Sequence, residues 1–319
     1  MKVPAPPSPT VRRRRLAAEL RRLREHARQT GDDVAARLKW SPSKISRLEN
    51  AKTGAKISDV RKLLDLYGVA GTHREELITL AREAERKGWW EDYSDALPAE
   101  YAAFIGLEAE AVSALNWESQ IIPGLLQTAE YAREIIRSVQ PIEIIPPSLV
   151  EARVATRLRR QELLTGPKPL ELSVVMDESA LLRNFGGRQV MLDQLHRIVE
   201  VAQLPNVTVH VLTLEGRHSI HSAAPFILLR FGKIHDVTPH DVVHVEQLTA
   251  GLSYEEPRDT YRYAIAYKEL LGAALPPEES LERISRIADR MQRLPDDAFG
   301  ELSTIATQDP VGEDTVALG

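Results

Sequence analysis

The sequence predicts a mixed fold, in which an all-α domain is followed by a larger α+β or α/β domain with a four- or five-stranded sheet. Two patterns and the length predict it. From residue 11 to about residue 87, apolar residues recur at helical spacing. Beyond a Gly-Trp-Trp break at residues 88–90, helical patterns mix with short β-branched runs, which are typical of strands. A chain of 319 residues agrees with two domains rather than one.

Five helices are expected in the N-terminal domain. The first carries apolar residues at i, i+4, i+7 and i+11, namely Leu16, Leu20, Leu23 and Ala27. Thr30 is a suitable N-cap for the second helix, and Ser41 followed by Pro42 begins the third, because proline is favoured at the first helical position. We expect Ser58 to cap the fourth helix and the fifth to span about residues 73–87.

The larger domain is expected to combine helices with strands. Apolar, β-branched runs predict strands at Leu170–Met176, Val207–Leu214, Phe226–Phe231 and Val242–Val245. Helical periodicity occurs at about residues 98–111, 123–138, 147–164, 189–203, 257–271 and 277–293. An aromatic cluster, expected to pack the linker onto this domain, consists of Trp89, Trp90 and Tyr93.

Composition distinguishes the two ends from the domains. The first ten residues are rich in proline, and residues 295–319 contain six acidic residues and no Lys or Arg. Such segments are expected to be disordered. The predicted organisation is a disordered arm at 1–10, the helical domain at 11–87, a linker at 88–97, the α+β domain at 98–294 and an acidic disordered tail at 295–319.

Charge is distributed unevenly along the chain. The formal net charge is −5, yet residues 1–72 carry 17 Lys or Arg against 7 Asp or Glu, a net of +10. Residues 73–319 carry 24 basic and 39 acidic residues, a net of −15. This asymmetry indicates a basic nucleic-acid-binding part joined to an acidic part. We expect the acidic part to repel DNA and binding to depend strongly on salt.

Composition also removes several classes of protein. The absence of cysteine excludes disulfides, iron–sulfur clusters, thiolate zinc sites and cysteine nucleophiles. No apolar run approaches the ~20 residues of a membrane span. The proline-rich start lacks the apolar segment of a signal peptide. A cytoplasmic protein without a membrane segment is therefore expected.

The clearest functional signal lies between Thr30 and Asn50. Two short helices are joined there by a tight turn at residues 38–40. This is the spacing of a helix-turn-helix, whose second helix can enter the major groove of DNA. The exposed face of that helix offers Ser41, Ser43, Lys44 and Arg47. Arginine suits a bidentate contact with guanine. The alternative is a basic helical bundle that binds no DNA.

The stretch from Ser41 to Asn50, SPSKISRLEN, resembles the recognition helix of lambda-repressor-like, or Xre-type, regulators. The resemblance implies a lambda-repressor-like helix-turn-helix domain that binds double-stranded DNA. It implies base-contacting roles for Pro42, Ser43 and Arg47. The residues assigned to DNA phosphates are Thr30, Ser41, Lys44, Asn50 and Lys52.

Four residues depart from the pattern of that family. Lys39 and Ala51 stand where glycines are usual, at positions that often require a positive φ. Asp32 and Asp33 lie at the helix end that usually faces phosphate, where they suit the helix dipole but oppose the charge of DNA. The basic run Arg12–Arg15 either lies on the DNA backbone or forms a solvated face.

Residues 89–293 resemble the large C-terminal domain of many actinobacterial Xre-type regulators. The most specific mark is Ile122-Pro-Gly-Leu-Leu-Gln-Thr-Ala-Glu-Tyr-Ala132. Further marks include Trp89-Trp90, Pro205-Asn-Val-Thr-Val-His-Val211 and Val243-His-Val-Glu246. The resemblance implies a DNA-binding transcription regulator, often described as antitoxin-like, that acts with a small separate protein. Partner binding and ligand sensing are the roles usually suggested for this domain.

Several polar residues of the larger domain are candidates for contact with a ligand or partner. Pro123 is expected to begin a helix whose apolar side is core, which leaves the polar residues of the motif for the surface. Arg153, Arg157 and Arg160 fall at i, i+4 and i+7 and form one basic stripe. This stripe is either a solvated face paired with Glu151 and Glu162 or a contact for DNA, an anionic ligand or an acidic partner. The candidates, which include this stripe, are Gln127, Tyr131, Arg153, Arg157, Arg160 and Glu178.

No catalytic or metal-binding constellation is found in the sequence. The histidines from His218 to His244 do not have the spacing of a closed metal site. A phosphate-binding loop and a Gly-x-Ser-x-Gly elbow are both missing. Asp177 and Glu178 are neighbours at a strand end and would point to opposite faces. We therefore expect no enzymatic activity, no cofactor and no metal.

Taken together, these patterns predict a sequence-specific DNA-binding transcriptional regulator. We expect a homodimer that places two recognition helices on half-sites ~34 Å apart. The larger domain is expected to mediate control by a small acidic or separate partner protein, or by a small-molecule effector. The alternative is an antitoxin-like component that acts mainly by binding a small partner protein and uses DNA binding for autoregulation. An enzyme is the least favoured alternative.

Overall fold

The computed structural model describes residues 11–85, 88–93, 96–139, 142, 144–215, 224–232, 240–247 and 251–293. The predicted arm and acidic tail lie outside the described residues, as do His218, His221 and His235. By its contacts the chain divides into two compact units. Unit 1 comprises Met1–Ala114 and Leu229–Thr260, and unit 2 comprises Leu115–Leu228 and Tyr261–Gly319. The five segments assigned from the sequence stay a prediction.

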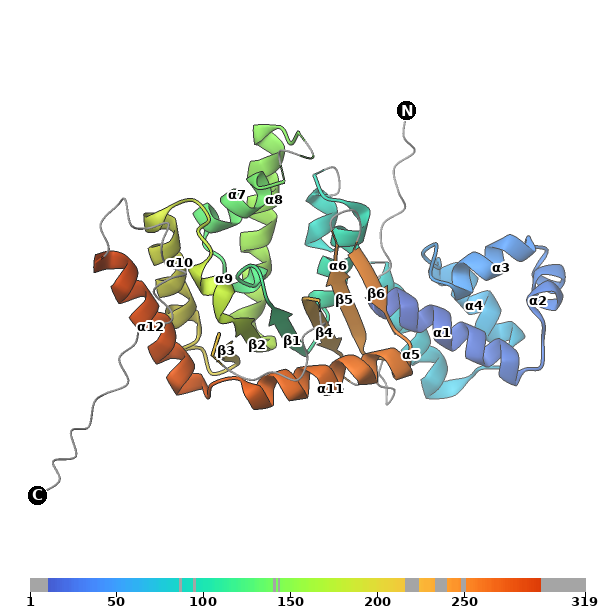
Figure 1. The fold of residues 1–319 in the computed structure, drawn as a ribbon. Coiled ribbons are helices and arrows are strands. Elements are labelled where there is room, and N and C mark those ends of the chain that lie inside the picture. Colours follow the sequence, from blue (N-terminus) through green and yellow to red (C-terminus); the bar gives the residue numbers. More distant parts are fainter. Residues whose placement is uncertain are drawn as a thin grey trace, which may run out of the picture. The chain divides into compact units, whose positions relative to one another are not determined.

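The five helices expected at the N-terminus are all present (Figure 1). They are α1 Val11–His26, α2 Gly31–Leu38, α3 Pro42–Glu49, α4 Ile57–Leu66 and α5 Gly71–Ala84. Helix α1 packs against α3 and α5, and α2 packs against α3. Apolar residues from all of these helices share one core, whose fully buried members include Leu20, Val34, Val60, Leu64 and Leu80. Removal of this apolar surface from water stabilises the helical region.

Helices α2 and α3 begin at the caps that the sequence predicts. The Thr30 hydroxyl accepts a hydrogen bond from the Asp33 backbone N–H at 3.2 Å. The Asp33 carboxylate accepts one from the Thr30 backbone N–H at 2.9 Å, which completes a capping box. At α3 the Ser41 hydroxyl accepts from the Lys44 N–H, and Pro42 is the first helical residue. Both caps satisfy N–H groups that have no partner within the helix.

The turns on either side of α3 adopt the left-handed backbone conformation. Lys39 has a φ of 55° and Ala51 a φ of 54°. The backbone therefore keeps the path for which glycine is usual, although neither residue is a glycine. A side chain in this conformation costs roughly 1–2 kcal/mol. The N–H of Lys39 donates to carbonyls of the last turn of α2, which fixes the end of that helix.

Two helix starts differ from the prediction. Helix α4 begins at Ile57 with Lys56 at the N-cap position, and no side chain caps it. Ser58 therefore lies inside the first turn and is not the cap. Helix α5 begins at Gly71, two residues before the predicted start. Apolar spacing locates a helix but not its first residue, because a serine is compatible both with the cap and with the first turn.

A six-stranded mixed sheet occurs in the described part of the larger region (Figure 1). Its strands are β1 Ser113–Glu118, β2 Glu171–Asp177, β3 Val207–Leu212, β4 Phe226–Arg230, β5 Val242–Glu246 and β6 Gly251–Tyr254. Their order is β3-β2-β1-β4-β5-β6. Strands β2 and β3 are parallel, whereas β5 and β6 are antiparallel. The predicted α+β class and all four predicted strands are confirmed.

The sheet has two strands that the sequence analysis did not foresee. Strand β1, SALNWE, mixes polar residues with Trp117, and β6, GLSY, contains glycine and serine. Neither is a β-branched run, which was the signal used to find strands. In β1 the buried Asn116 side chain donates to the Phe226 carbonyl at 3.3 Å, so a polar residue is accommodated in the sheet.

The rest of the described chain contains further α- and 3₁₀-helices. They are η1 Trp89–Tyr93, α6 Ala99–Glu108, η2 Gly124–Leu126, α7 Ala129–Arg137, α8 Pro147–Arg160, η3 Gln161–Leu164, α9 Glu178–Leu182, α10 Arg188–Val201, α11 Pro257–Ala273 and α12 Pro277–Arg293. The helix predicted from Pro123 is divided. After the short η2, Gln127 is extended and Thr128 caps α7 through its hydroxyl. Helices α7 and α8 then pack against each other.

The predicted linker contains an aromatic cluster packed on α6. Trp90, Leu97 and Ile105 are buried together, with Trp89 and Tyr93 at the margin. The rings of Trp89 and Trp90 meet edge to face with centroids 6.0 Å apart. A side chain on Gly106 would come within 3.1 Å of the Trp90 ring, so this glycine permits the close approach. The packing role predicted for these aromatic residues is therefore confirmed.

Candidate nucleic-acid interface

Helix α3 has one buried and one exposed face. Ile45 and Leu48 are 2% and 4% exposed and belong to the core of the helical region. The opposite face carries the exposed residues Pro42, Ser43, Ser46, Arg47 and Asn50. Helical periodicity produces this separation, because residues three or four apart share a face. The structure thus brings the three residues assigned to base contacts onto the exposed side of one helix.

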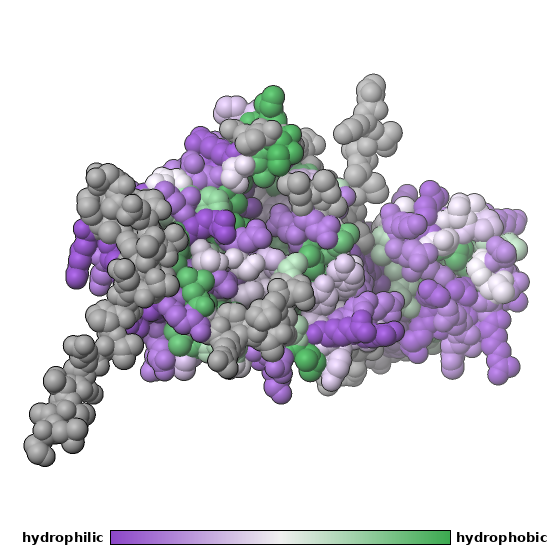
Figure 2. All heavy atoms as spheres, in the orientation of Figure 1, coloured by the Kyte–Doolittle hydropathy of each residue, from purple (hydrophilic) through white to green (hydrophobic). Residues whose placement is uncertain are grey.

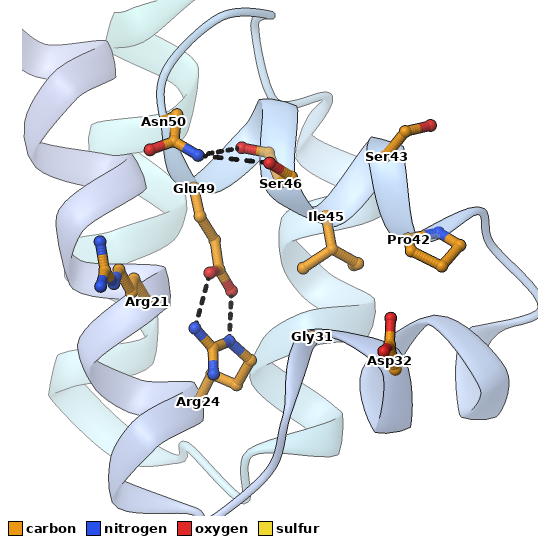
Figure 3. Close-up of a pocket in the computed structure, with 10 residues that line it drawn as sticks. All are labelled: Arg21, Arg24, Gly31, Asp32, Pro42, Ser43, Ile45, Ser46, Glu49 and Asn50. Atoms are coloured by element: carbon orange, nitrogen blue, oxygen red, sulfur yellow. Dashed lines mark hydrogen bonds and ion pairs between the residues drawn. The ribbon is translucent and has the colours of Figure 1, made fainter.

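An open hollow of about 550 Å³ lies between α1, α2 and the exposed side of α3 (Figure 3). Helix α1 contributes Arg21 and Arg24, and α2 contributes Gly31 and Asp32. The lining residues from α3 and its end are Pro42, Ser43, Ile45, Ser46, Glu49 and Asn50. Arg21 and Ser46 were not assigned to this surface from the sequence. Ser46 could have been found from its spacing, because it lies three residues after Ser43 on α3. Arg21 gives no such signal, because the sequence does not show how α1 crosses α3.

A bidentate ion pair joins α1 to the end of α3 (Figure 3). Arg24 Nε and a terminal nitrogen lie 2.7 and 2.9 Å from the two carboxylate oxygens of Glu49. Another Arg24 nitrogen donates to the carbonyl of Gln29 at 2.9 Å. Hydrogen bonding to Glu49 raises the pKa of Arg24 above its ordinary value. Because the two side chains are only 14% and 10% exposed, this pair is partly shielded from solvent.

Besides the caps Thr30 and Ser41, two further residues assigned to phosphates have partners within the protein. The Lys44 ammonium lies 2.8 Å from the carboxylate of Asp59 and 3.6 Å from the centroid of the Trp40 ring. These contacts hold α3 to α4 and to the turn before α3. The Asn50 side chain donates to the Ser46 carbonyl at 2.7 Å. Asn50 remains exposed, and its amide oxygen is directed away from Ser46 (Figure 3).

The basic run at the start of α1 is engaged in contacts inside unit 1. Arg12 forms ion pairs with Glu83 and Glu110. Arg13 donates to the carbonyl of Ala84 at 3.0 Å, and Arg14 pairs with Glu255. Burial lowers the pKa of Arg14, whose side chain is 25% exposed. The two alternatives left open for this run, a DNA contact and a solvated face, are therefore replaced by a third, in which the arginines join the helical region to acidic residues further along the chain.

Hydrophilic residues cover most of the visible surface of α1 to α4 (Figure 2). Arg47 and Lys52 are exposed and form no ion pair with any other described residue. Both charges thus stay available to an anionic partner. No helix among the described residues is long and apolar enough to span a membrane.

The Pro-Gly-Leu-Leu-Gln-Thr stretch of unit 2 is held by a buried polar network. The Gln127 side chain is 1% exposed, donates to the Ile122 carbonyl at 2.6 Å and accepts from Arg157 at 2.9 Å. The hydroxyl of Tyr131, which is fully buried, accepts from the Ile122 N–H at 3.1 Å. Burial raises the pKa of Tyr131. This corrects the expectation that Gln127 and Tyr131 are surface contacts.

Two glutamines that the sequence analysis did not single out complete this network. Gln194 of α10, which is fully buried, donates to the Leu126 carbonyl at 2.8 Å and accepts from the Thr128 N–H at 2.7 Å. Gln161 donates to the Gln127 carbonyl at 2.6 Å. Glutamine suits this task because one side chain both donates and accepts. No local pattern reveals the role, since the partners are 34 to 68 residues away in the sequence.

Arg160 of the basic stripe and Glu178 also form contacts in the interior of the protein. Arg160 is 4% exposed, with its guanidinium beside Gly124, where a side chain would approach to 3.3 Å. Glu178 is 1% exposed and accepts from the Leu214 N–H and from the side chain of Arg283. These two residues are therefore not exposed contact sites. Arg153 and Arg157 are half-buried.

Two acidic residues, Glu151 and Glu178, differ from the placement that the sequence analysis gave them. Glu151 pairs with Arg133 of α7 at 2.7 Å rather than with the basic stripe of α8. Asp177 caps α9 by accepting from the Ser179 N–H, and Glu178 is the first residue of that helix rather than part of a strand. No cluster of metal-ligating residues occurs among the described residues.

The geometry of α2, the turn and α3 defines a helix-turn-helix, the class of domain that binds DNA. The family model described as a helix-turn-helix domain matches residues 15–77. A second model, described as a domain of unknown function (DUF5753), matches residues 101–286, which is more than half of the chain. The chain belongs to the DUF5753 family. No curated protein and no solved structure matches it.

Replacement of Gln127 by alanine tests whether this side chain is structural. The change leaves the Ile122 carbonyl and the Arg157 guanidinium without one of their partners, so it is expected to lower the free energy of unfolding by about 1–3 kcal/mol. Thermal and denaturant unfolding measure the loss. The matched control is Gln189→Ala on the exposed face of α10, which should change stability by less than about 0.5 kcal/mol. Equal stabilities for the two variants would contradict the structural role.

Proposed function

We propose that this protein is a sequence-specific DNA-binding transcriptional regulator whose helix α3 enters the major groove. The observation that carries the proposal is the exposed face of α3, where Pro42, Ser43 and Arg47 lie opposite a buried apolar face. A helix held by its apolar side, with polar residues outward, has the arrangement of a recognition helix. The match to a helix-turn-helix model and the resemblance to Xre-type regulators support it.

The proposed contacts divide into base edges and phosphates. Arg47 has the donor geometry for guanine, and Ser43 can donate to or accept from a base. Thr30, Ser41, Asn50 and Lys52 surround α3 and the start of α2, where backbone phosphates are expected. Lys44 already pairs with Asp59, which offsets its charge, so its contribution is expected to be smaller than that of Lys52.

The proposal includes a homodimer acting on DNA in the cytoplasm. A two-fold dimer would place two copies of α3 on half-sites ~34 Å apart. It assigns no enzymatic activity, cofactor or metal to the chain. The net of +10 in residues 1–72 supports the position of the DNA-binding surface, since it opposes the net of −15 in the rest of the chain.

Replacement of Arg47 by alanine tests the base-contacting role. A duplex selected by the full-length protein from random sequences serves as the ligand. Because Arg47 is proposed to contact a base, the variant is expected to lose about 1–3 kcal/mol of binding free energy on this duplex and little on a scrambled one. Fluorescence anisotropy at fixed salt measures both.

The control for this change is Arg82→Ala, which removes one exposed arginine charge from α5 instead of α3. It should leave the ratio of the two affinities unchanged. If Arg47→Ala and Arg82→Ala behave alike on the selected duplex, the base-contacting role is wrong. If the wild-type protein selects no sequence, the proposed function itself is wrong.

Control of the regulator by a partner protein or a small molecule is assigned to the DUF5753 region. Its support is size, because residues 101–286 far exceed what dimerisation requires. Purification of the full chain from the cells that encode it is expected to recover a bound protein or small molecule. Recovery of a small protein would favour the antitoxin-like alternative. A chain that carries nothing and binds DNA equally well without this region would contradict the assignment.

A further inference from the structure

The first turn of α2 contains two neighbouring aspartates with different surroundings. Asp33 belongs to the capping box, and hydrogen bonds from the Thr30 hydroxyl and N–H lower its pKa. Asp32 is exposed and forms no hydrogen bond or ion pair with any other described residue. Capping of α2 therefore explains Asp33, whereas Asp32 contributes to α2 only through the helix dipole.

Asp32 lies on the side of the domain that the recognition helix presents. It lines the same hollow as Pro42, Ser43 and Ser46 of α3. In the close-up its carboxylate points toward Pro42, at the N-terminal end of α3 (Figure 3). The N-terminal residues of a recognition helix are those that contact base edges. An unpaired carboxylate is thus placed next to the end of α3 that would approach the bases.

The neighbours of Asp32 offer few competing acceptors. Pro42 has no polar side chain, and the Ser43 hydroxyl lies 3.1 Å from that of Ser41. The other acid of the hollow, Glu49, is bound to Arg24. Among the described residues that line the hollow, Asp32 is therefore the carboxylate available to an incoming donor.

A carboxylate distinguishes bases because it only accepts hydrogen bonds. In the major groove cytosine presents an amino donor alone, adenine presents an amino donor beside the N7 acceptor, and guanine and thymine present carbonyl acceptors. The N7 acceptor of adenine opposes a carboxylate, so cytosine is the base edge that suits it best. A negative charge near DNA also weakens binding to every sequence, since it opposes the phosphates. This general penalty cancels when two sequences are compared, so discrimination comes from attraction to an amino donor and repulsion of a carbonyl at the contacted base.

We infer that Asp32 is a specificity-determining residue, whose carboxylate accepts a hydrogen bond from the amino group of a cytosine beside the N-terminal end of α3 and disfavours bases with a carbonyl there. This inference rests on the DNA-binding function proposed above. With this residue, α2 contributes one base contact in addition to those proposed for α3. It also explains why an acidic residue stands at the N-terminal end of α2, where a positive charge would increase the affinity for DNA.

The test compares sequences selected from a random duplex library by the full-length protein and by variants. Wild type should enrich a cytosine at one position in each half-site. Asp32→Asn keeps an acceptor and adds a donor, so the preference for cytosine over thymine and guanine at that position should fall about fivefold or more. Asp32→Ala should lower the same preference without favouring any other base. Both variants should bind a scrambled duplex more tightly than wild type does.

The matched control is Asp65→Asn, which removes one acidic charge from α4, outside the hollow. It should leave the selected sequence unchanged, and thermal unfolding should show that all variants are folded. If Asp32→Asn and Asp32→Ala tighten binding to all duplexes but keep the wild-type preferences, Asp32 acts through charge alone and the inference is overturned. If the wild-type protein enriches no sequence, the proposed function fails and the inference fails with it. The selection with wild type alone identifies this outcome.

Discussion

The ion pair between Arg24 and Glu49 is the interaction on which the candidate interface depends. Glu49 is the last residue of α3, and Arg24 also donates to the carbonyl of Gln29 between α1 and α2. One guanidinium thus joins the first helix, the α1–α2 connection and the end of the recognition helix. Apolar contacts of Ile45 and Leu48 hold the buried face of α3, but they do not fix its rotation alone. The bidentate pair fixes the rotation of α3, because both the distances and the plane of such a pair are specific.

In the helical region, the ion-pair partner of each cation decides whether it is available to DNA, and the number of cations alone does not. The arginines at the start of α1 bind glutamates of unit 1 that lie outside residues 1–72, so part of the +10 is offset there. Lys44 pairs with Asp59, an acid that is already counted in that net. Exposed cations that form no ion pair with another described residue lie around α3 and also on α4, where Arg61 and Lys62 are exposed. Exposed pairs contribute little to stability, whereas the shielded Arg24–Glu49 pair contributes more. Net charge identified the correct region, but only the structure separates structural cations from available ones.

Local signals were sufficient for the helix-turn-helix and insufficient for the larger region. Thr30 and Ser41 act on N–H groups within three residues, so their caps are visible in the sequence. The contacts of Gln127 and Gln194 join segments up to 68 residues apart, and nothing local marks them. Polar character therefore suggested surface contact for Gln127, Tyr131 and Glu178, where the fold instead buries and satisfies them. Strand β6 lacks β-branched residues and forms through pairing with β5.

The most direct test of this account is the sequence discrimination of Glu49→Gln, measured as the ratio of affinities for a selected and a scrambled duplex. Removal of a negative charge would by itself strengthen binding to DNA. Because the account makes Glu49 the residue that orients α3, it predicts a fall of roughly tenfold in this ratio, which corresponds to about 1.4 kcal/mol. Glu75→Gln, which removes an exposed acid from α5, should leave the ratio unchanged. An unaltered or increased ratio for a folded Glu49→Gln protein would contradict the account.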